Sequence, residues 1–253
     1  MAAEKTLALV LKVVEFSESS CIVTLMTRDF GKIATLAKGA RRRKSPYEGA
    51  LDLLSISRIV FLHKKSESLD LLTEAKLERR FRSAAVDLNR LYSGYYVAEL
   101  LNELTDENDP IAGLFQLASE TLIAIDDGKE TAFQLLQFEL GALNLLGHRP
   151  MLEQCVGCGR GKQFNDLNVQ FGLRLGGILC ATCRKGKTSV VSLSASAWQM
   201  LLRLIKPDSS QPIDELGPNQ GEIRQFMNQY ISHHLGHRPK MQKYLATIKT
   251  GIK

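Results

Sequence analysis

SCIVTLMTRDFGKIATLA, residues 20–37, is the stretch that decides the fold of the first part of the chain. Its two ends, 20–26 and 32–37, are rich in Val, Ile, Leu and Thr, the residues that favour β-strands. Between them, residues 28–31 read Arg-Asp-Phe-Gly, which is typical of a tight turn. The stretch therefore predicts a β-hairpin.

Three further segments near the hairpin have the same strand-like composition: 6–14, 51–62 and 69–77. Five short strands, with no helix long enough for parallel crossovers between them, favour a small closed barrel, and an OB-type barrel fits that count. We therefore predict an OB-fold nucleic-acid-binding domain over residues 1–80.

From about Phe81 the apolar residues recur at the 3,4 spacing of an α-helix. The pattern predicts helices over 91–104, from Pro110 to 125, over 133–146, over 195–206 after a capping Ser194, and over 222–235. Pro110 suits the first turn of its helix, where a missing N–H costs nothing. The class is α+β, and residues 81–253 are predicted to form a helical bundle domain with an embedded cysteine module at 151–190.

Four of the five cysteines form two C-x2-C pairs, Cys155 with Cys158 and Cys180 with Cys183, which 21 residues separate. This spacing lets four thiolates meet at one point as a tetrahedral Zn²⁺ shell, and Gly157 permits the turn. A complete shell leaves no place for a reactive water, so the zinc is predicted to be structural. The alternatives are two disulfides or a redox-active pair. A redox-active C-x2-C motif, however, does not require a second C-x2-C pair.

The net charge of +6 is unevenly distributed along the chain. Residues 1–80 hold 15 basic and 10 acidic side chains, residues 81–150 hold 4 and 11, and residues 151–253 hold 14 and 6. The two basic regions suit a polyanion such as nucleic acid, and the acidic block does not.

A cluster of cations follows the third predicted strand, at residues 38–46 (KGARRRKSP). Guanidinium groups bind phosphate oxygens bidentately, so a loop with four adjacent cations suits several phosphate contacts. A solvated charge run is the alternative interpretation. The predicted DNA-binding residues are Arg28, Lys32, Lys38, Arg41, Arg42, Arg43 and Lys44.

The sequence shows no sign of catalysis or of membrane insertion. It contains no phosphate-binding loop, no nucleophile elbow and no H-E-x-x-H motif. No apolar run reaches the ~18 residues that cross a bilayer. Cys21 lies inside a predicted strand and is expected to be a core residue. The paired positions His233 and His237 are expected to be surface histidines at a helix end.

Segments along the whole chain, taken in order, resemble one family. They are 20–45, the LTEA of 72–75, 138–147 with Pro150 after it, the two C-x2-C pairs, and 234–240 (HLGHRPK). Together they resemble the RecO family of bacterial recombination mediators, and the four cysteines match its zinc-bearing members.

The resemblance implies an OB-fold joined to a helical domain that carries a zinc module. It also implies binding to single- and double-stranded DNA, annealing of complementary strands, and action with RecR to load RecA onto strands coated by the single-strand DNA-binding protein, SSB. The SSB C-terminal tail is implied to dock on the helical domain. A cytoplasmic, nucleoid-associated location follows from these roles, and none of them needs ATP.

Two other classes of function fit the residues. One is a protein-interaction adaptor that uses the acidic region 81–150, and the other is a zinc-ribbon RNA-binding or translation factor. An enzyme is the class that the residues support least, because the one credible metal site is closed.

Overall fold

The structure is a computed structural model, and it describes residues 2–63, 69–83, 86–161, 168–206 and 216–248. By packing, the chain divides into two units. The first comprises residues 1–129 and 239–253, and the second comprises residues 130–238.

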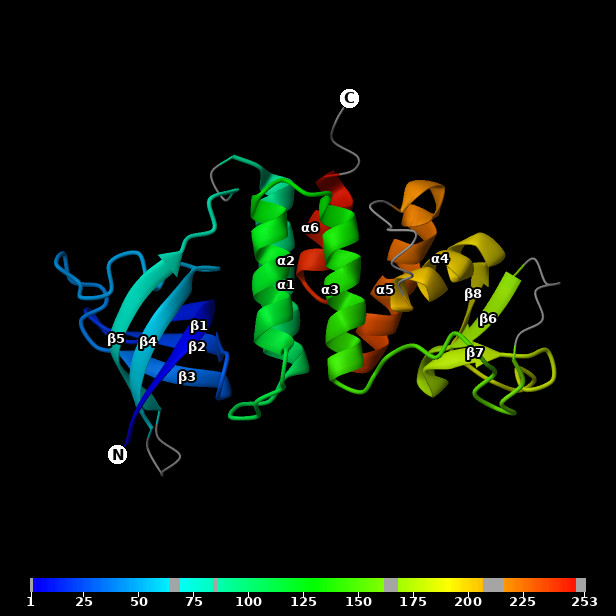
Figure 1. Cartoon of the computed structure of the whole chain (residues 1–253), viewed down its shortest axis with the longest axis horizontal. Coiled ribbons are helices and arrows are strands. Elements are labelled where there is room, and N and C mark those ends of the chain that lie inside the picture. The colour runs from blue at the N-terminus through cyan, green and yellow to red at the C-terminus, as the bar shows by residue number, and fades with distance from the viewer. Residues whose placement is uncertain (1, 64–68, 84–85, 162–167, 207–215, 249–253) are drawn as a thin grey trace. The chain divides into compact units, whose positions relative to one another are not determined.

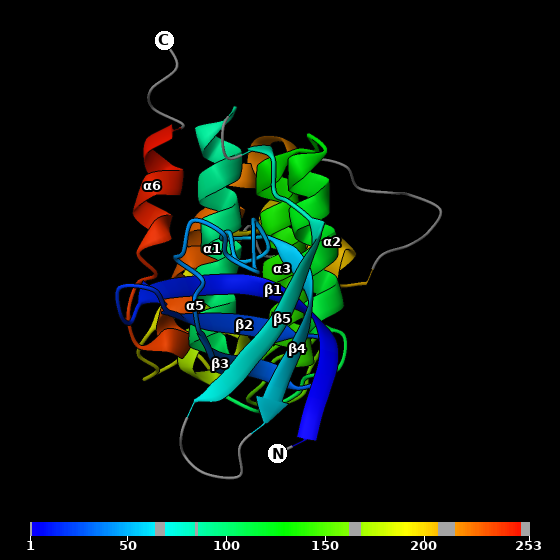
Figure 2. The same cartoon turned by 90° about the vertical axis from the view of Figure 1, so that its left-hand side faces the viewer.

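The first unit begins with a closed five-stranded barrel (Figures 1 and 2). Its strands are β1 (Ala2–Glu15), β2 (Cys21–Thr27), β3 (Gly31–Ala37), β4 (Ile56–His63) and β5 (Asp70–Arg79). All pairs are antiparallel except β3 with β5, which are parallel and close the barrel. Five strands closed in the order β1-β2-β3-β5-β4 form an OB-fold barrel, which confirms the predicted class.

Alternating apolar side chains fill the barrel. On β2, Cys21, Val23 and Leu25 point inward, since every second residue of a strand faces the same side. Cys21 is therefore a core residue, as predicted, and burial raises the pKa of its thiol. The edge-on packing of Phe30 against Phe61, with ring centroids 5.3 Å apart, extends this core.

Three helices complete the first unit: α1 (Leu88–Leu104), α2 (Leu114–Asp126) and α6 (Met241–Ile248). Asp87 caps α1 by accepting hydrogen bonds from two backbone N–H groups of the first turn. The Glu99 carboxylate on α1 accepts hydrogen bonds from the backbone N–H groups of Lys240 and Met241, at 2.7 and 2.9 Å. These bonds fix the start of α6, a helix that the sequence did not predict.

The start of α2 differs from its prediction. The helix begins at Leu114 after Gly113, so Pro110 lies outside its first turn. The segment before α2 instead packs against the β2–β3 turn, where a Cβ added to Gly31 would come within 2.3 Å of the Asp109 carbonyl oxygen. The residues around Pro110 therefore make a tertiary contact with the β2–β3 turn and do not begin the helix.

The second unit combines three helices with a three-stranded sheet in the order β7-β6-β8. Its elements are α3 (Thr131–Leu145), β6 (Asn168–Gly172), η2 (Leu173–Leu175), β7 (Gly177–Leu179), β8 (Val190–Ser194), α4 (Ala195–Ile205), η3 (Gly217–Asn219) and α5 (Gln220–Leu235). Ser194 caps α4 as predicted, because its hydroxyl accepts a hydrogen bond from the Ala197 N–H at 3.2 Å.

Polar contacts anchor the second unit. Trp198 is buried, and its indole N–H donates to the Leu152 carbonyl at 2.9 Å. Arg224 on α5 donates two hydrogen bonds to the buried Glu139 carboxylate on α3, at 2.5 and 2.6 Å. A charge-assisted pair of this kind ties α3 to α5. That residues 81–253 form a single domain stays a prediction.

None of the helices in the described segments is long and apolar enough to span a bilayer.

Candidate nucleic-acid interface and metal centre

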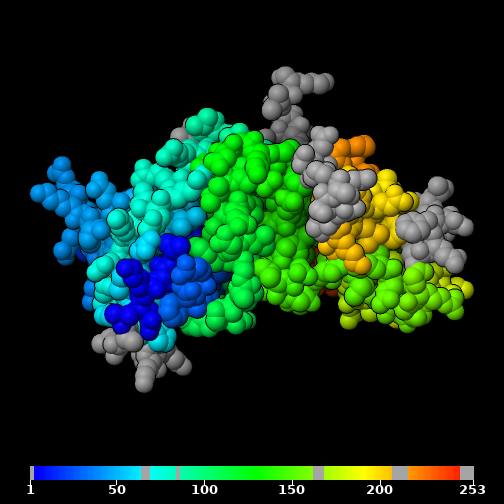
Figure 3. All heavy atoms as spheres, viewed as in Figure 1, coloured from blue at the N-terminus to red at the C-terminus, as the bar shows by residue number. Residues whose placement is uncertain are grey.

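The predicted basic cluster lies on the loop that joins β3 to β4. The side chains of Lys38, Arg41, Arg42, Arg43 and Lys44 are all exposed. The loop stands out from the body of the barrel, and Figure 3 shows it as a protruding light-blue lobe. Its position leaves the cations open to solvent on one end of the barrel.

Arg41 anchors the first half of this loop to the turn between β1 and β2. Its backbone N–H donates to the Ser19 carbonyl at 3.1 Å, and its guanidinium donates to the Ser17 carbonyl at 3.1 Å. The same guanidinium lies 2.9 Å from the Glu15 carboxylate. Arg41 is therefore partly neutralised and holds the loop in place.

Tyr47 anchors the second half. The ring is buried, and its hydroxyl donates to the Leu72 carbonyl inside the barrel at 2.8 Å. Nearby, the Ser57 hydroxyl donates to the Ala50 carbonyl at 2.7 Å. Arg41 and Tyr47 therefore anchor the two ends of the segment that carries the exposed cations 42–44.

Arg28 lies at the other end of the strands from this loop. It follows β2 at the β2–β3 turn, whereas Lys38 follows the far end of β3, seven residues along the strand. At 3.3–3.4 Å per residue this separates the two by about 20 Å. Arg28 also donates to the Asp29 carboxylate at 3.2 Å. The structure therefore does not bring Arg28 together with the cations of the loop.

Lys32 is a correction to the predicted interface. Its side chain is buried, and the ammonium donates to the carbonyl oxygens of Asn102 and Thr105 at 2.6 and 2.5 Å. These carbonyls end α1 and have no partner within the helix, so Lys32 supplies the donor that they lack. Burial lowers the pKa of Lys32. The residue serves the packing of the barrel against α1, and we remove it from the interface.

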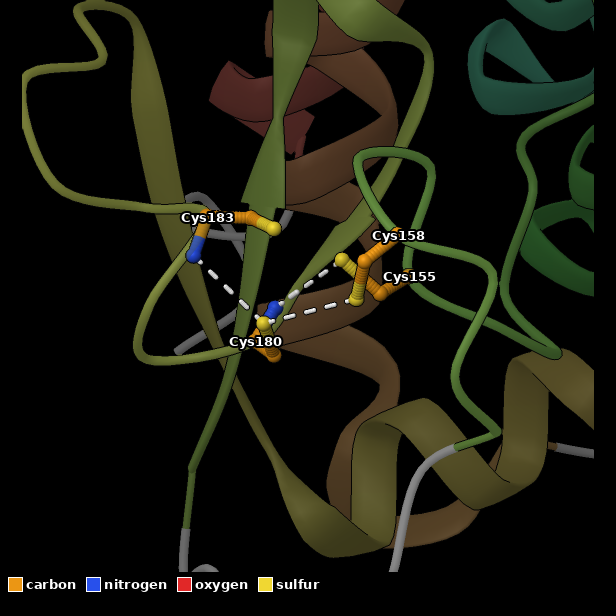
Figure 4. A group of neighbouring side chains, drawn as sticks. All are labelled: Cys155, Cys158, Cys180 and Cys183. Carbon is orange, nitrogen blue, oxygen red and sulfur yellow. Dashed lines mark hydrogen bonds between the residues drawn. The ribbon is translucent and has the colours of Figure 1, made fainter.

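The four predicted zinc ligands come together in the second unit (Figure 4). The Sγ atoms of Cys155, Cys158, Cys180 and Cys183 all lie within 4.8 Å of one another. Those of Cys158 and Cys180 are 3.8 Å apart. Neighbouring sulfurs of a regular tetrahedron with Zn–S bonds of about 2.3 Å lie about 3.8 Å apart. The cluster therefore fits a tetrahedral metal ion.

Backbone groups favour ionised sulfur in this cluster. Burial opposes ionisation of Cys155, but the N–H groups of Cys180, Gly157 and Cys158 together lower its pKa to about 6. Hydrogen bonding to Cys180 and Cys158 raises the pKa of Cys183 to about 12. Four neighbouring sulfurs thus cannot all ionise by themselves, whereas a bound cation offsets their mutual repulsion.

The local backbone explains how the two cysteine pairs converge. A Cβ on Gly157 would lie 2.9 Å from the Cys183 sulfur, so only glycine fits there. Gly159 adopts φ +72° and donates its N–H to the Cys155 carbonyl at 2.8 Å, which closes the first turn. The second pair follows β7. Between the two pairs, residues 168–172 form the strand β6 and residues 173–175 form the 3-10 turn η2.

The histidines near the end of α5 form no metal cluster within the described segments. His233 and His237 are exposed. The neighbouring His234 is half-buried instead, with its ring 4.5 Å from that of Tyr230 and 4.7 Å from that of His148, measured between centroids. Burial and the charges of His148 and His233 lower the pKa of His234 to about 4. No pattern in the sequence had indicated this buried histidine.

Comparisons with known proteins match nearly the whole chain. A family model described as "Recombination protein O N terminal" matches residues 1–81, and one described as "Recombination protein O C terminal" matches residues 85–243. These two models together cover both the barrel and the cysteine module.

Curated relatives named DNA repair protein RecO agree with the family models. The protein of Rhodopirellula baltica is 38% identical and covers 94% of this chain and 97% of its own length. Those of Anaeromyxobacter dehalogenans and Symbiobacterium thermophilum are 33% and 30% identical, cover 98% and 99% of this chain, and match over 98% and 99% of their own lengths. The protein described above, with its OB-fold barrel and four-cysteine module, belongs to the RecO family.

Proposed function

We propose that this protein acts in DNA repair and homologous recombination as a mediator that binds single- and double-stranded DNA. The observation that carries the proposal is the exposed, anchored cationic loop on an OB-fold barrel in a chain of the RecO family. Barrels of this kind hold single strands along basic surfaces.

The loop is suited to hold phosphates without reading bases. Arg42, Arg43 and Lys44 extend beyond the anchoring Arg41 and are exposed. Guanidinium forks bind phosphate oxygens bidentately, and each neutralised phosphate releases counterions. Binding by this route depends on salt and tolerates any sequence, which is what a protein that acts on arbitrary DNA breaks requires.

Annealing of complementary strands follows from the same contacts. Two strands repel each other through their phosphates, and cations that neutralise both strands lower this repulsion. This step consumes no nucleotide, so we propose that the protein is not an enzyme. With RecR, it would then help to load RecA onto single strands coated by SSB, whose C-terminal tail would dock on the helical domain.

We propose that the four cysteines hold a structural Zn²⁺. Their thiolates would fill its tetrahedral shell, which leaves no open position for a water molecule. The metal would tie the turn at Cys155–Gly159 to the turn after β7 and so stabilise the second unit. We further propose that the protein acts at the nucleoid, in the cytoplasm, with residues 1–80 as its DNA-binding domain.

The direct test is an annealing assay on complementary oligonucleotides coated with SSB, run without any nucleotide. The proposal predicts that the protein accelerates formation of duplex, and that RecR with it promotes assembly of RecA on the coated strand. Single-stranded RNA of the same length serves as a competitor. No acceleration of annealing, together with no retention of DNA at near-physiological salt, would favour a protein adaptor, and preferential competition by RNA would favour an RNA-binding factor.

A further inference from the structure

The turn between β1 and β2 carries an exposed aromatic ring. Phe16 is 59% exposed, the only aromatic residue so exposed in the described part of the barrel. By contrast, Tyr47 is buried, and Phe30 packs against the buried Phe61 in the core. The Phe16 ring therefore lies largely outside the barrel core, where a ligand can reach it.

The ring is held on a well-defined backbone. The Phe16 N–H donates to the Ser20 carbonyl at 3.0 Å, and the Ser17 N–H donates to the same oxygen at 3.2 Å. These bonds close the turn before β2 begins. A ring on a closed turn loses little conformational entropy when a ligand covers it, which favours binding.

The same turn is joined to the cationic loop. Arg41 bonds to Ser17 and Ser19 and pairs with Glu15, so the residues on both sides of Phe16 contact the start of the loop. Figure 2 shows the β1–β2 turn and the loop after β3 on the same side of the barrel. An aromatic face and a row of cations therefore share one surface.

We propose that Phe16 is a base-stacking site for single-stranded nucleic acid, with Arg42, Arg43 and Lys44 holding the phosphates of the same strand. The proposal rests on the proposed DNA-binding function and adds a site that distinguishes single strands from duplexes. Bases within a duplex are stacked on each other and offer no free face, whereas an unpaired base stacks on an aromatic ring whatever its identity.

An apolar protein surface is the competing occupant, because Val13 and Val14 on β1 are also exposed, by 37% and 42%. The neighbouring cations favour a polyanion over an apolar partner, since binding an apolar surface would remove water from charged groups without pairing them. The test must therefore separate the aromatic face of Phe16 from its apolar area.

The experiment compares four variants with the wild type: Phe16→Ala, Phe16→Leu, Phe16→Trp and, as the control for exposed apolar area, Val14→Ala. Affinity is measured for an oligo-dT strand and for a duplex of equal length across a series of salt concentrations. We expect Phe16→Ala and Phe16→Leu to weaken single-strand binding by roughly 5- to 150-fold, the value of one base-aromatic stack. Duplex affinity and the salt slope should stay as in the wild type, and Val14→Ala should bind like the wild type.

The Phe16→Trp variant gives a direct signal. Its affinity for oligo-dT should be retained, and its fluorescence should be quenched as bases stack on the indole. The wild type is the matched control, because its single tryptophan, Trp198, is buried in the second unit and should respond little.

Three results would overturn the stacking site: unchanged single-strand affinity in Phe16→Ala, equal losses for single strand and duplex, or full affinity in Phe16→Leu. The wild type serves to tell this failure from failure of the proposed function. If the wild type binds oligo-dT and Phe16→Ala binds equally well, only the stacking site is wrong. If the wild type binds neither the oligo-dT strand nor the duplex, the proposed function is wrong as well.

Discussion

Lysine residues at the two ends of β3 have different roles, although the sequence grouped them together. Lys32 is buried and donates to two carbonyl oxygens of the segment that ends α1, whereas Lys38 is exposed beside the cationic loop. Chemical identity alone therefore does not place a lysine in an interface. The long side chain of Lys32 lets its ammonium group donate to a carbonyl at the end of α1, 70 residues away in the sequence.

Replacing Lys32 should affect stability and not DNA binding. In Lys32→Met the carbonyls of Asn102 and Thr105 lose their donor, which costs about 1–3 kcal/mol of unfolding free energy for buried polar groups. The measurement is urea denaturation, with DNA affinity determined under conditions where the variant is folded. The matched control is Lys38→Met, which should keep its stability and bind DNA more weakly. If Lys32→Met instead kept its stability and bound DNA more weakly, Lys32 would belong to the DNA interface.

His234 should make stability depend on pH. Burial and the nearby histidines lower its folded pKa to about 4, below the unfolded value of about 6.5. As the pH falls from about 6.5 to about 4 the unfolded chain takes up this proton first, so stability is lost across that window. His234→Phe keeps an aromatic ring and should flatten the dependence.

The control for that prediction is His237→Phe, because His237 is exposed beyond the end of α5 and is not among the groups that lower the pKa of His234. Unfolding midpoints measured between pH 7 and pH 4 for the three proteins provide the test. Identical pH profiles for His234→Phe and the wild type would show that the acid loss comes from other groups.

At the scale of elements, the cysteine module should need its metal. We expect one Zn²⁺ per chain in the purified protein, and Cys180→Ser should lose it together with protection of the β6–β7 hairpin, since binding energy of such sites is folding energy. Native mass spectrometry gives the metal content, and hydrogen exchange gives the local stability. Cys21→Ser is the control, because Cys21 lies in the barrel core. A protein that keeps full hairpin protection after the metal is removed would contradict the structural role.

Elements with a strong local signal were predictable from the sequence. The five strands have β-branched composition, Ser194 is a good helix cap, and the two C-x2-C pairs have ligand spacing, so local chemistry decides each of them. The convergence of the four cysteines was predictable because it depends on local features: glycines in the first turn and the β6–β7 hairpin, which ends beside the second pair.

The elements that the sequence missed depend on distant contacts. The start of α2 depends on Gly31 in the barrel, which brings the Asp109–Pro110 backbone close. The helix α6 is eight residues long, too short for a clear period, and Glu99 on α1 fixes its start. The exposure of Phe16 is a further feature that the sequence does not reveal, because composition does not show which side of a turn a ring occupies.

At the scale of the whole molecule, we propose that the barrel makes the DNA contacts and that the cysteine module stabilises the second unit. The loop is held by Arg41 and Tyr47 and leaves three cations exposed between them. If these cations neutralise phosphates, they must contribute to the salt dependence of binding, since each neutralised phosphate releases counterions.

The most direct measurement is the slope of log affinity against log salt for single-stranded DNA, in the wild type and in the variant with Arg42, Arg43 and Lys44 all replaced by Ala. Arg41 is left in place because it anchors the loop, and Arg28→Ala, at the other end of the strands, is the control. We predict that the slope becomes shallower by about 0.7 for each phosphate that is no longer neutralised, so by up to about 2 in the triple variant, with little change in the control. An unchanged slope and affinity in the triple variant would contradict the assignment of DNA binding to this loop.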